Sequence, residues 1–221
     1  MDYDLVRSKR KTLAVSIRNG QVIVKAPLKL SDDYIKRFVD SKADWINKKL
    51  AEHRGRSALF RPLTDGTSVL YRGAFCPIVR TEKFKRVTMS SGALYVPIKY
   101  ADKLATYRAV IAWYKRIAAA ELKELLDVTA AKIGLKYASF ALTNARTKWG
   151  SCDGSCNIRL NWRLVMLDDG LKDYVAVHEL CHTLCHDHSK KFWAEVKKRY
   201  PSYSSAKKRL NTYSQLTSMY R

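Results

Sequence analysis

The segment His178-Glu179-Leu180-Cys181-His182 constrains the fold of this chain more than any other part of its sequence. It continues an amphipathic run that begins at Asp169, so we expect a helix over 169–184. Residues four apart share one face of a helix, which lets His178 and His182 offer two imidazoles to one metal ion. On such a helix Glu179 would lie beside the ion, where it could take a proton from a bound water.

Imidazole ligands at this spacing favour zinc, and a zinc-bound water has a pKa of roughly 7 instead of about 15.7. The motif therefore predicts one Zn²⁺ per chain and a hydrolase in which Glu179 is the general base. Two histidines on a buried helix face, without a metal, are the simpler alternative. Four of the five histidines lie within residues 178–188, which favours the metal site.

The third metal ligand can be His186 or His188. On a continuous helix His186 would lie about 12 Å along the axis from His178, too far for one tetrahedral ion. His188 requires the chain to turn after Leu184 and come back, which is the spacing of zincins whose third ligand follows a tight turn. We therefore prefer His188 as the third ligand.

The first hundred residues read as strands around one or two helices. Alternating apolar residues over 13–24, interrupted by Asn19-Gly20, predict a hairpin with a type I′ turn. Ser31 can cap a helix that extends to about His53. Segments 68–80 and 87–98 predict further strands.

A long helix is expected over 103–133, ended by Gly134. Short strands over 138–143 and 156–163 and a helix over 189–200 should follow. The change of composition near residue 98 suggests a β-rich N-terminal region, 1–98, and a catalytic domain, 99–221. The fold class predicted is α+β.

The formal net charge of +22 makes a polyanion a plausible partner or substrate, with a generally basic protein as the alternative. Basic and aromatic residues interleave after His188, a pattern that suits nucleic acid but is also typical of a solvated helix face. The start has no signal-peptide pattern and no apolar run is long enough to span a membrane, so we expect a cytoplasmic protein without a membrane partner. Five cysteines in such a chain suggest reduced, buried thiols.

Several segments together resemble the YgjP-like metallopeptidase family, which is related to the SprT-like and WLM zincins. They are RKTLAVSI (10–17), SKADWI (41–46), RTKWGSC (146–152), NIRLNWRL (157–164), YVAVHELCH (174–182) and HSKKFWAEV (188–196). The resemblance implies a zincin-like fold, a zinc ion held by His178, His182 and His188, and Glu179 as the base. It implies a metallopeptidase, and a UTP pyrophosphatase activity is also attached to the family. Relatives that act on DNA-bound proteins give a third alternative, a nucleic-acid-associated protease.

Residues outside the motif are candidates for substrate binding. In NIRLNWRL, Arg159 and Asn161 alternate with apolar residues, so they could face a peptide that pairs with this strand, or belong to a core strand with solvated arginines. Arg146 and Trp149 lie in the preceding loop, suited to an anionic group or to structural stacking. Tyr203 and Arg146 are candidates for stabilising an oxyanion.

Overall fold

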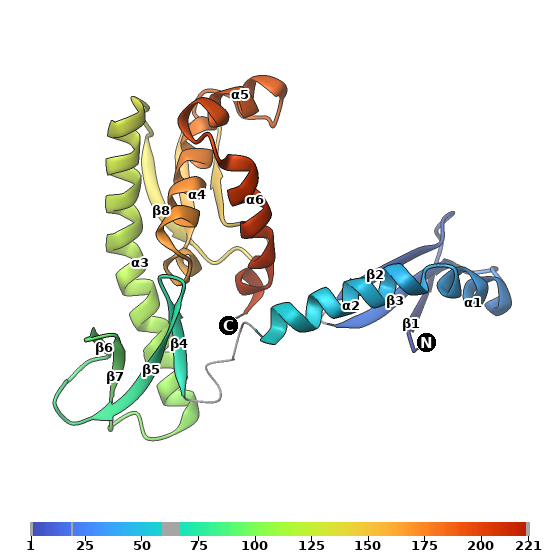
Figure 1. Ribbon diagram of the computed structural model, residues 1–221, viewed down its shortest axis with the longest axis horizontal. Helices are drawn as coiled ribbons and strands as arrows, with labels where there is room; N and C mark the ends of the chain where they lie inside the picture. Colours follow the sequence, from blue (N-terminus) through green and yellow to red (C-terminus); the bar gives the residue numbers. More distant parts are fainter. Residues whose placement is uncertain (1, 19, 59–66, 220–221) are drawn as a thin grey trace. The chain divides into compact units, whose positions relative to one another are not determined.

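The structure is a computed structural model that describes residues 2–18, 20–58 and 67–219 (Figure 1). The chain divides into two compact units, Met1–Phe60 and Arg61–Arg221. The boundary expected near residue 98 is not where the chain divides, because the strands over 68–97 pack with the long helix that follows them. Both units combine helices with strands, so the fold is α+β as predicted. No helix among the described residues is long and apolar enough to cross a membrane.

The first unit is a three-stranded sheet in the order β1-β3-β2 with two helices. Its elements are β1 Asp4–Ser8, β2 Ala14–Arg18, β3 Gln21–Pro27, α1 Asp32–Asp40 and α2 Ala43–Ala58. The buried face of β3 packs against apolar residues of both helices, including Ile35 and Ile46.

Strands β2 and β3 pair antiparallel, which confirms the predicted hairpin. Gly20 has a positive φ of 80° at its turn, while Asn19 lies outside the described residues. The expected single helix is broken at Ser41, and Ser31 stands at the N-cap of α1 without a side-chain hydrogen bond. Strand β1, which the sequence analysis did not predict, pairs parallel with β3.

The second unit begins with a four-stranded sheet in the order β4-β5-β7-β6. Its strands are β4 Ser68–Tyr71, β5 Ala74–Thr81, β6 Thr88–Ser90 and β7 Ala93–Pro97. Ser91 and Gly92 both have positive φ, as a type I′ turn between β6 and β7 requires. The Tyr114 hydroxyl of the next helix donates to the Leu70 carbonyl at 2.6 Å, and Tyr71 packs edge-on against Trp113.

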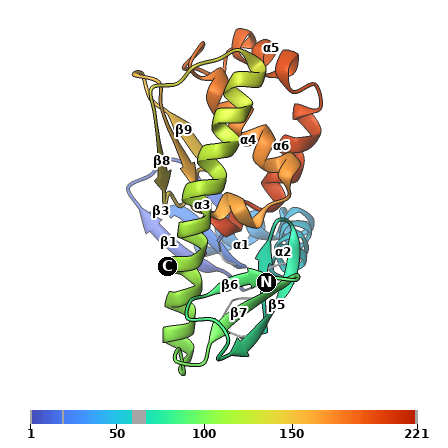
Figure 2. The same ribbon diagram turned by 90° about the vertical axis from the view of Figure 1, so that its left-hand side faces the viewer.

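Helix α3, Lys103–Ile133, is the longest helix described. The Asp102 carboxylate accepts from the Ala105 N–H at its start, and Gly134, in the left-handed conformation, ends it. It lies beside helix α4, Asp169–Cys181, and beside a second sheet in the order β8-β10-β9 (Figures 1 and 2). These strands are β8 Ser139–Thr143, β9 Gly150–Cys152 and β10 Asn157–Asn161.

The strand expected over 156–163 ends at Asn161, where a 3₁₀ helix, Trp162–Met166, begins. The Asn161 side chain accepts from the Arg163 N–H and caps this turn, which stops the strand. Arg163 is consequently buried, and its guanidinium donates to the Met219 carbonyl.

Helix α4 lies at the centre of the second unit, in contact with α3, β9, α5 and α6. Helices α5, Lys190–Arg199, and α6, Tyr203–Thr212, follow it, and a 3₁₀ helix, Ser214–Ser218, comes near the end of the chain. Helix α4 ends three residues earlier than expected, at Cys181, and α5 matches its predicted range within one residue at each end. The early end of α4 lets the chain turn back toward its own last turn.

Candidate metal centre

Helix α4 presents His178 and His182 on the same face at its C-terminal end. The Asp168 carboxylate caps the start of the helix by accepting from the Leu171 N–H at 3.2 Å. The remaining faces of α4 are buried against its neighbours. This packing fixes the direction in which both imidazoles point.

The turn after α4 determines which nitrogen of His182 carries the proton. The N–H groups of Leu184 and Cys185 both donate to the Cys181 carbonyl, so the chain reverses there. The Nδ1 of His182 lies 2.9 Å from the Cys185 carbonyl, which can only accept a hydrogen bond. Nδ1 therefore carries the proton, and Nε2 keeps its lone pair for a ligand.

The same turn brings His188 to the end of α4. The Asp187 carboxylate accepts from the Ser189 N–H, and Ser189 caps α5. Nε2 of His188 lies 3.2 Å from Nε2 of His178. Two nitrogens bound to one zinc ion at the usual tetrahedral geometry lie about 3.3 Å apart, so the observed separation fits a shared ion.

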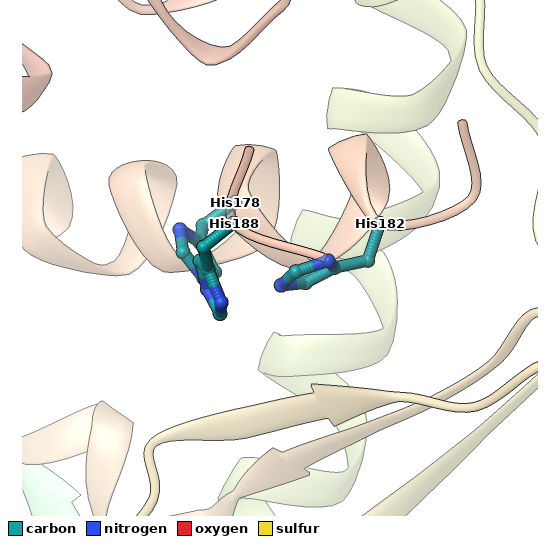
Figure 3. A group of neighbouring side chains, drawn as sticks. All are labelled: His178, His182 and His188. Carbon is teal, nitrogen blue, oxygen red and sulfur yellow. The ribbon is translucent and has the colours of Figure 1, made fainter. Parts of the chain in front are cut away.

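His178, His182 and His188 each offer a ligand atom, and these atoms lie within 4.8 Å of one another. Figure 3 shows the ring of His182 directed toward the rings of His178 and His188. Among the described residues, this is the one group of three or more histidine, cysteine or acidic side chains with such convergence. His186 lines the adjacent cavity but is outside the group.

Burial keeps the two helix histidines neutral. It lowers the pKa of His178 to about 3, with smaller contributions from the neighbouring His182 and His188. Burial also lowers the pKa of His182. Because only the neutral imidazole binds a metal, both residues are in the ligand form at neutral pH.

Two buried polar atoms here have no hydrogen-bond partner within the described part of the chain: Nδ1 of His178 and Oε2 of Glu179. Such atoms are rare in folded proteins, and they mark places where a water, an ion or a ligand completes the structure. Both atoms belong to the helix that carries the histidine group, and Oε2 of Glu179 is available to a water or a ligand there. Three imidazole ligands suit zinc well, and Mg²⁺ poorly.

Glu179 is only 4% exposed, and it lies against the backbone of β9. Burial raises the pKa of its carboxyl to about 8, an effect that the charge of Lys148 opposes. A Cβ atom added to Gly150 would lie 2.6 Å from Oε1 of Glu179. The carboxylate can hold its place only because residue 150 has no side chain.

A cavity of about 700 Å³ opens beside the histidine group. Strand β9 forms one wall, and Trp193, which stacks on Tyr203 with ring centroids 5.4 Å apart, is part of another. The residues that line it are Lys148, Trp149, Gly150, Ser151, Cys152, Tyr174, Val175, His178, Glu179, His182, His186, His188, Trp193, Lys207, Leu210 and Asn211.

Of the five residues considered for substrate binding, Trp149 lines the cavity. Asn161 is fully buried and donates to the carbonyls of Ala145 and Lys148, so it holds the loop before β9 in place. Arg159 pairs with Asp153 at 3.3 Å, away from the cavity lining.

Arg146 is exposed, and its backbone carbonyl accepts from the Thr217 hydroxyl. Tyr203 reaches the site indirectly, through its stacking on Trp193. Strand β10, for which pairing with a peptide and a place in the core were both considered, has β8 on one side and β9 on the other, as the core alternative requires. Both of its edges are occupied, and the strand edge at the cavity belongs to β9.

The sequence analysis missed Gly150 and Lys207. A glycine between a tryptophan and a serine does not reveal which side chain it accommodates, because that contact depends on how β9 packs against α4. Lys207 reaches the cavity from α6, well after the motif in the sequence. The sequence indicated only that it belongs to a run of basic residues. The five cysteines are all free, as predicted, but only Cys76 and Cys181 are buried, and the expectation of burial is wrong for Cys152, Cys156 and Cys185.

A sequence model described as the YgjP-like metallopeptidase domain matches residues 11–213. No curated protein matches the chain.

Two solved structures are similar over part of the chain. The crystal structure of the metallopeptidase zymogen of Pyrococcus abyssi abylysin is 22% identical, covers 41% of this chain and 92% of its own, and has a TM-score of 0.38. That of Methanocaldococcus jannaschii jannalysin is 18% identical, covers 41% and 94%, and has a TM-score of 0.37. The family match spans most of both units, and the chain belongs to the YgjP-like metallopeptidase family.

Proposed function

We propose that this chain is a zinc-dependent peptidase in which His178, His182 and His188 hold one Zn²⁺ and Glu179 is the general base. The observation that carries the proposal is the convergence of three ligand atoms within 4.8 Å, next to a buried carboxylate with an unpartnered oxygen. Bound zinc would supply an acidic water and polarise the scissile carbonyl.

The chain's own residues divide the remaining work. Glu179 accepts the proton of the attacking water and delivers it to the departing amine. The Cys185 carbonyl holds His182 in the tautomer that a ligand needs. Gly150 leaves the space that the Glu179 carboxylate occupies.

Strand β9 supports a peptide substrate. It is an edge strand of its sheet, paired with β10 on one side, and all three of its residues line the cavity. An extended peptide can pair with such an edge through backbone hydrogen bonds, which fixes the scissile bond in position without regard to side chains.

The decisive experiment combines metal analysis with the variant Glu179→Gln. We expect one zinc per chain in both proteins, and a loss of peptide hydrolysis of about 10²-fold or more in the variant, since the base is removed while the ligands stay. The matched control is Glu124→Gln on α3, an exposed side chain far along the chain from the motif, which should change neither property.

Full activity of Glu179→Gln would refute the assigned base. Wild-type protein that binds no zinc after reconstitution would refute the metal site. A nucleoside triphosphate is assayed in parallel, and release of pyrophosphate without peptide cleavage would replace the peptidase with a pyrophosphohydrolase.

A further inference from the structure

The cavity beside the histidine group has an uneven charge. Its lining contains two lysines, Lys148 and Lys207, and a single carboxylate, Glu179. That carboxylate is buried and is assigned to the reaction. Within residues 2–18, 20–58 and 67–219, no acidic side chain forms an ion pair with either lysine.

Lys207 is held in place by aromatic contacts. Its ammonium lies 4.1 Å from the centroid of the Trp193 ring, a cation–π contact, and the other contacts of that ring include the stack with Tyr203. The Trp193 ring is also 5.7 Å from the rings of both His178 and His188, centroid to centroid. The positive charge of Lys207 is therefore fixed close to the proposed metal.

Lys148 comes from a different part of the chain. It lies two residues before β9, and its carbonyl accepts from the buried Asn161 side chain at 3.0 Å. The neighbouring carbonyl of Ala145 accepts from the same amide at 2.8 Å. The loop that carries Lys148 is thus fixed at two points, and its side chain borders the cavity near Glu179.

Neither ammonium group has a carboxylate partner in the described part of the chain, and one of them lies over an aromatic ring. Together they leave a positive potential in a partly enclosed site. Both lysines are exposed, but both line the cavity and Lys207 contacts the Trp193 ring, which a basic surface alone does not require. A substrate that carries an anionic group into this cavity can offset the positive potential and gain charge-assisted hydrogen bonds.

We propose that Lys148 and Lys207 form an anion-binding subsite that makes this protein select peptides with an acidic side chain close to the scissile bond. The inference deepens the proposed peptidase function and rests on it. A carboxylate and a phosphate offer the same chemistry to two ammonium groups. The exposed edge of β9 favours the peptide, because a nucleotide has no backbone to pair with it.

The first test compares two peptides that differ at one position, with Glu in one and Gln in the other, using the zinc-loaded full chain at low ionic strength. We expect kcat/KM to be about fivefold to tenfold higher for the acidic peptide, and the preference to shrink as salt is added. In the double variant Lys148→Met with Lys207→Met, the ratio should fall to about one while zinc content is kept. The control Lys208→Met, an exposed neighbour on α6 outside the cavity lining, should retain the wild-type ratio.

The second test measures binding without turnover. Calorimetry on the zinc-loaded Glu179→Gln protein should show the acidic peptide binding several times more tightly than its Gln counterpart, and the difference should vanish when both lysines are replaced. A wild-type ratio of one, or a ratio unchanged in the double variant, would overturn the subsite. Tighter binding of the acidic peptide without any peptide hydrolysis by wild type would leave the subsite standing and reject the peptidase. If a nucleoside triphosphate bound more tightly than the acidic peptide and was hydrolysed, the assignment to peptides would be overturned.

Discussion

Helix α4 borders two cavities that differ in whether their polar side chains have partners. Near its start, a cavity of about 310 Å³ is lined by charged residues, and four of them, Arg72, Glu121, Asp169 and Lys172, form ion pairs with one another. Near its end, the cavity of about 700 Å³ contains the histidine group and a carboxylate oxygen without a partner in the described part of the chain. One helix therefore has a satisfied polar network at one end and an unsatisfied one at the other.

The network at the start of α4 is complete around Lys172, whose side chain is 6% exposed. Its ammonium lies 2.7 Å from Asp169 and 4.0 Å from Glu121. Glu121 also accepts from the Tyr71 hydroxyl at 2.6 Å and pairs with Arg72. Removing one partner of a buried charge of this kind destabilises the fold, whereas a buried group left without partners is available to a ligand.

The largest expected effect is the loss of zinc when one residue of the histidine group is replaced. Replacing His188 with Ala should remove the third ligand, so zinc binding and peptide hydrolysis should be lost together. Zinc should raise the Tm of wild type, because a ligand that binds only the folded state stabilises it, and it should not raise the Tm of this variant. Metal content and thermal unfolding with and without added zinc measure both effects.

His186→Ala is the matched control, since His186 lines the same cavity but lies outside the group whose ligand atoms converge. It should keep one zinc per chain. If His186→Ala lost the metal and His188→Ala kept it, the third ligand would be His186 and not His188.

The next prediction concerns two glycines in the hairpin of β9 and β10. Gly150→Ala should place a methyl group 2.6 Å from Oε1 of Glu179 and displace the carboxylate. Displacement of a reacting group by about 1 Å can cost about 10²-fold in rate, so we expect kcat to fall by about 10-fold to 100-fold with zinc retained. Steady-state kinetics and metal analysis check it.

Gly154→Ala is the control, because a Cβ at Gly154 would meet no atom within 4 Å. It should leave kcat unchanged. Equal activity of the two variants would show that the close approach of Gly150 to Glu179 does not matter for the reaction.

The grouping of the histidines could be predicted from the sequence because its signal is local, although α4 itself ends three residues earlier than expected. The spacing of His178 and His182 alone indicates a shared helix face, and the impossible reach of His186 along a continuous helix favours His188. The structure brings together the three histidines that this reasoning selected.

Features that depend on contacts between distant segments were not predictable in the same way. Strand β9 has three residues, too few for an alternating pattern to be recognised. Strand β1 pairs parallel with β3, and neither sequence specifies that pairing locally. Asn161 lies in an alternating sequence that is typical of a strand. Its side chain nevertheless ends the strand by accepting from the Arg163 N–H, and it fixes the preceding loop by donating to the Lys148 carbonyl.

A substitution in the ion-paired network at the start of α4 should lower the stability of the fold and leave the activity unchanged. Glu121→Gln removes the charge that faces Lys172 and Arg72 and weakens the bond with the Tyr71 hydroxyl. We expect the free energy of unfolding to fall by about 1–2 kcal/mol, the usual cost of disturbing a partly buried polar contact. Urea unfolding measures this, with Glu124→Gln on the same cavity wall as a control expected to stay within about 0.5 kcal/mol. A loss of zinc or of kcat in Glu121→Gln would contradict the separation of the two ends.

The smallest effect is a difference in pH dependence between two acids of the first turns of α4. The hydrogen bond with Lys172 lowers the pKa of Asp169 below its usual 3.8, while burial, followed by the charge of Asp169, raises the pKa of Asp173. A lowered pKa means that the charged Asp169 stabilises the fold above pH 3.8, and that this contribution is lost as the pH falls through the folded-state pKa. Asp169→Asn should therefore be less stable than wild type at pH 7, by less than about 1 kcal/mol because the side chain is mostly exposed, and equal to it in acid.

Asp173→Asn should show the opposite sign. Its raised pKa means that the folded state favours the protonated carboxyl, so the stability it contributes is present below the ordinary value of 3.8 and is lost as the pH rises through the folded-state pKa. Removing the charge should make this variant slightly more stable than wild type at pH 7, with the gain disappearing in acid. Urea unfolding of both variants between pH 2.5 and 7, an interval of about four units around the usual carboxyl pKa, measures the two trends. Parallel trends would mean that Lys172 does not discriminate between the two acids, and the network at the start of α4 would then be less specific than its distances indicate.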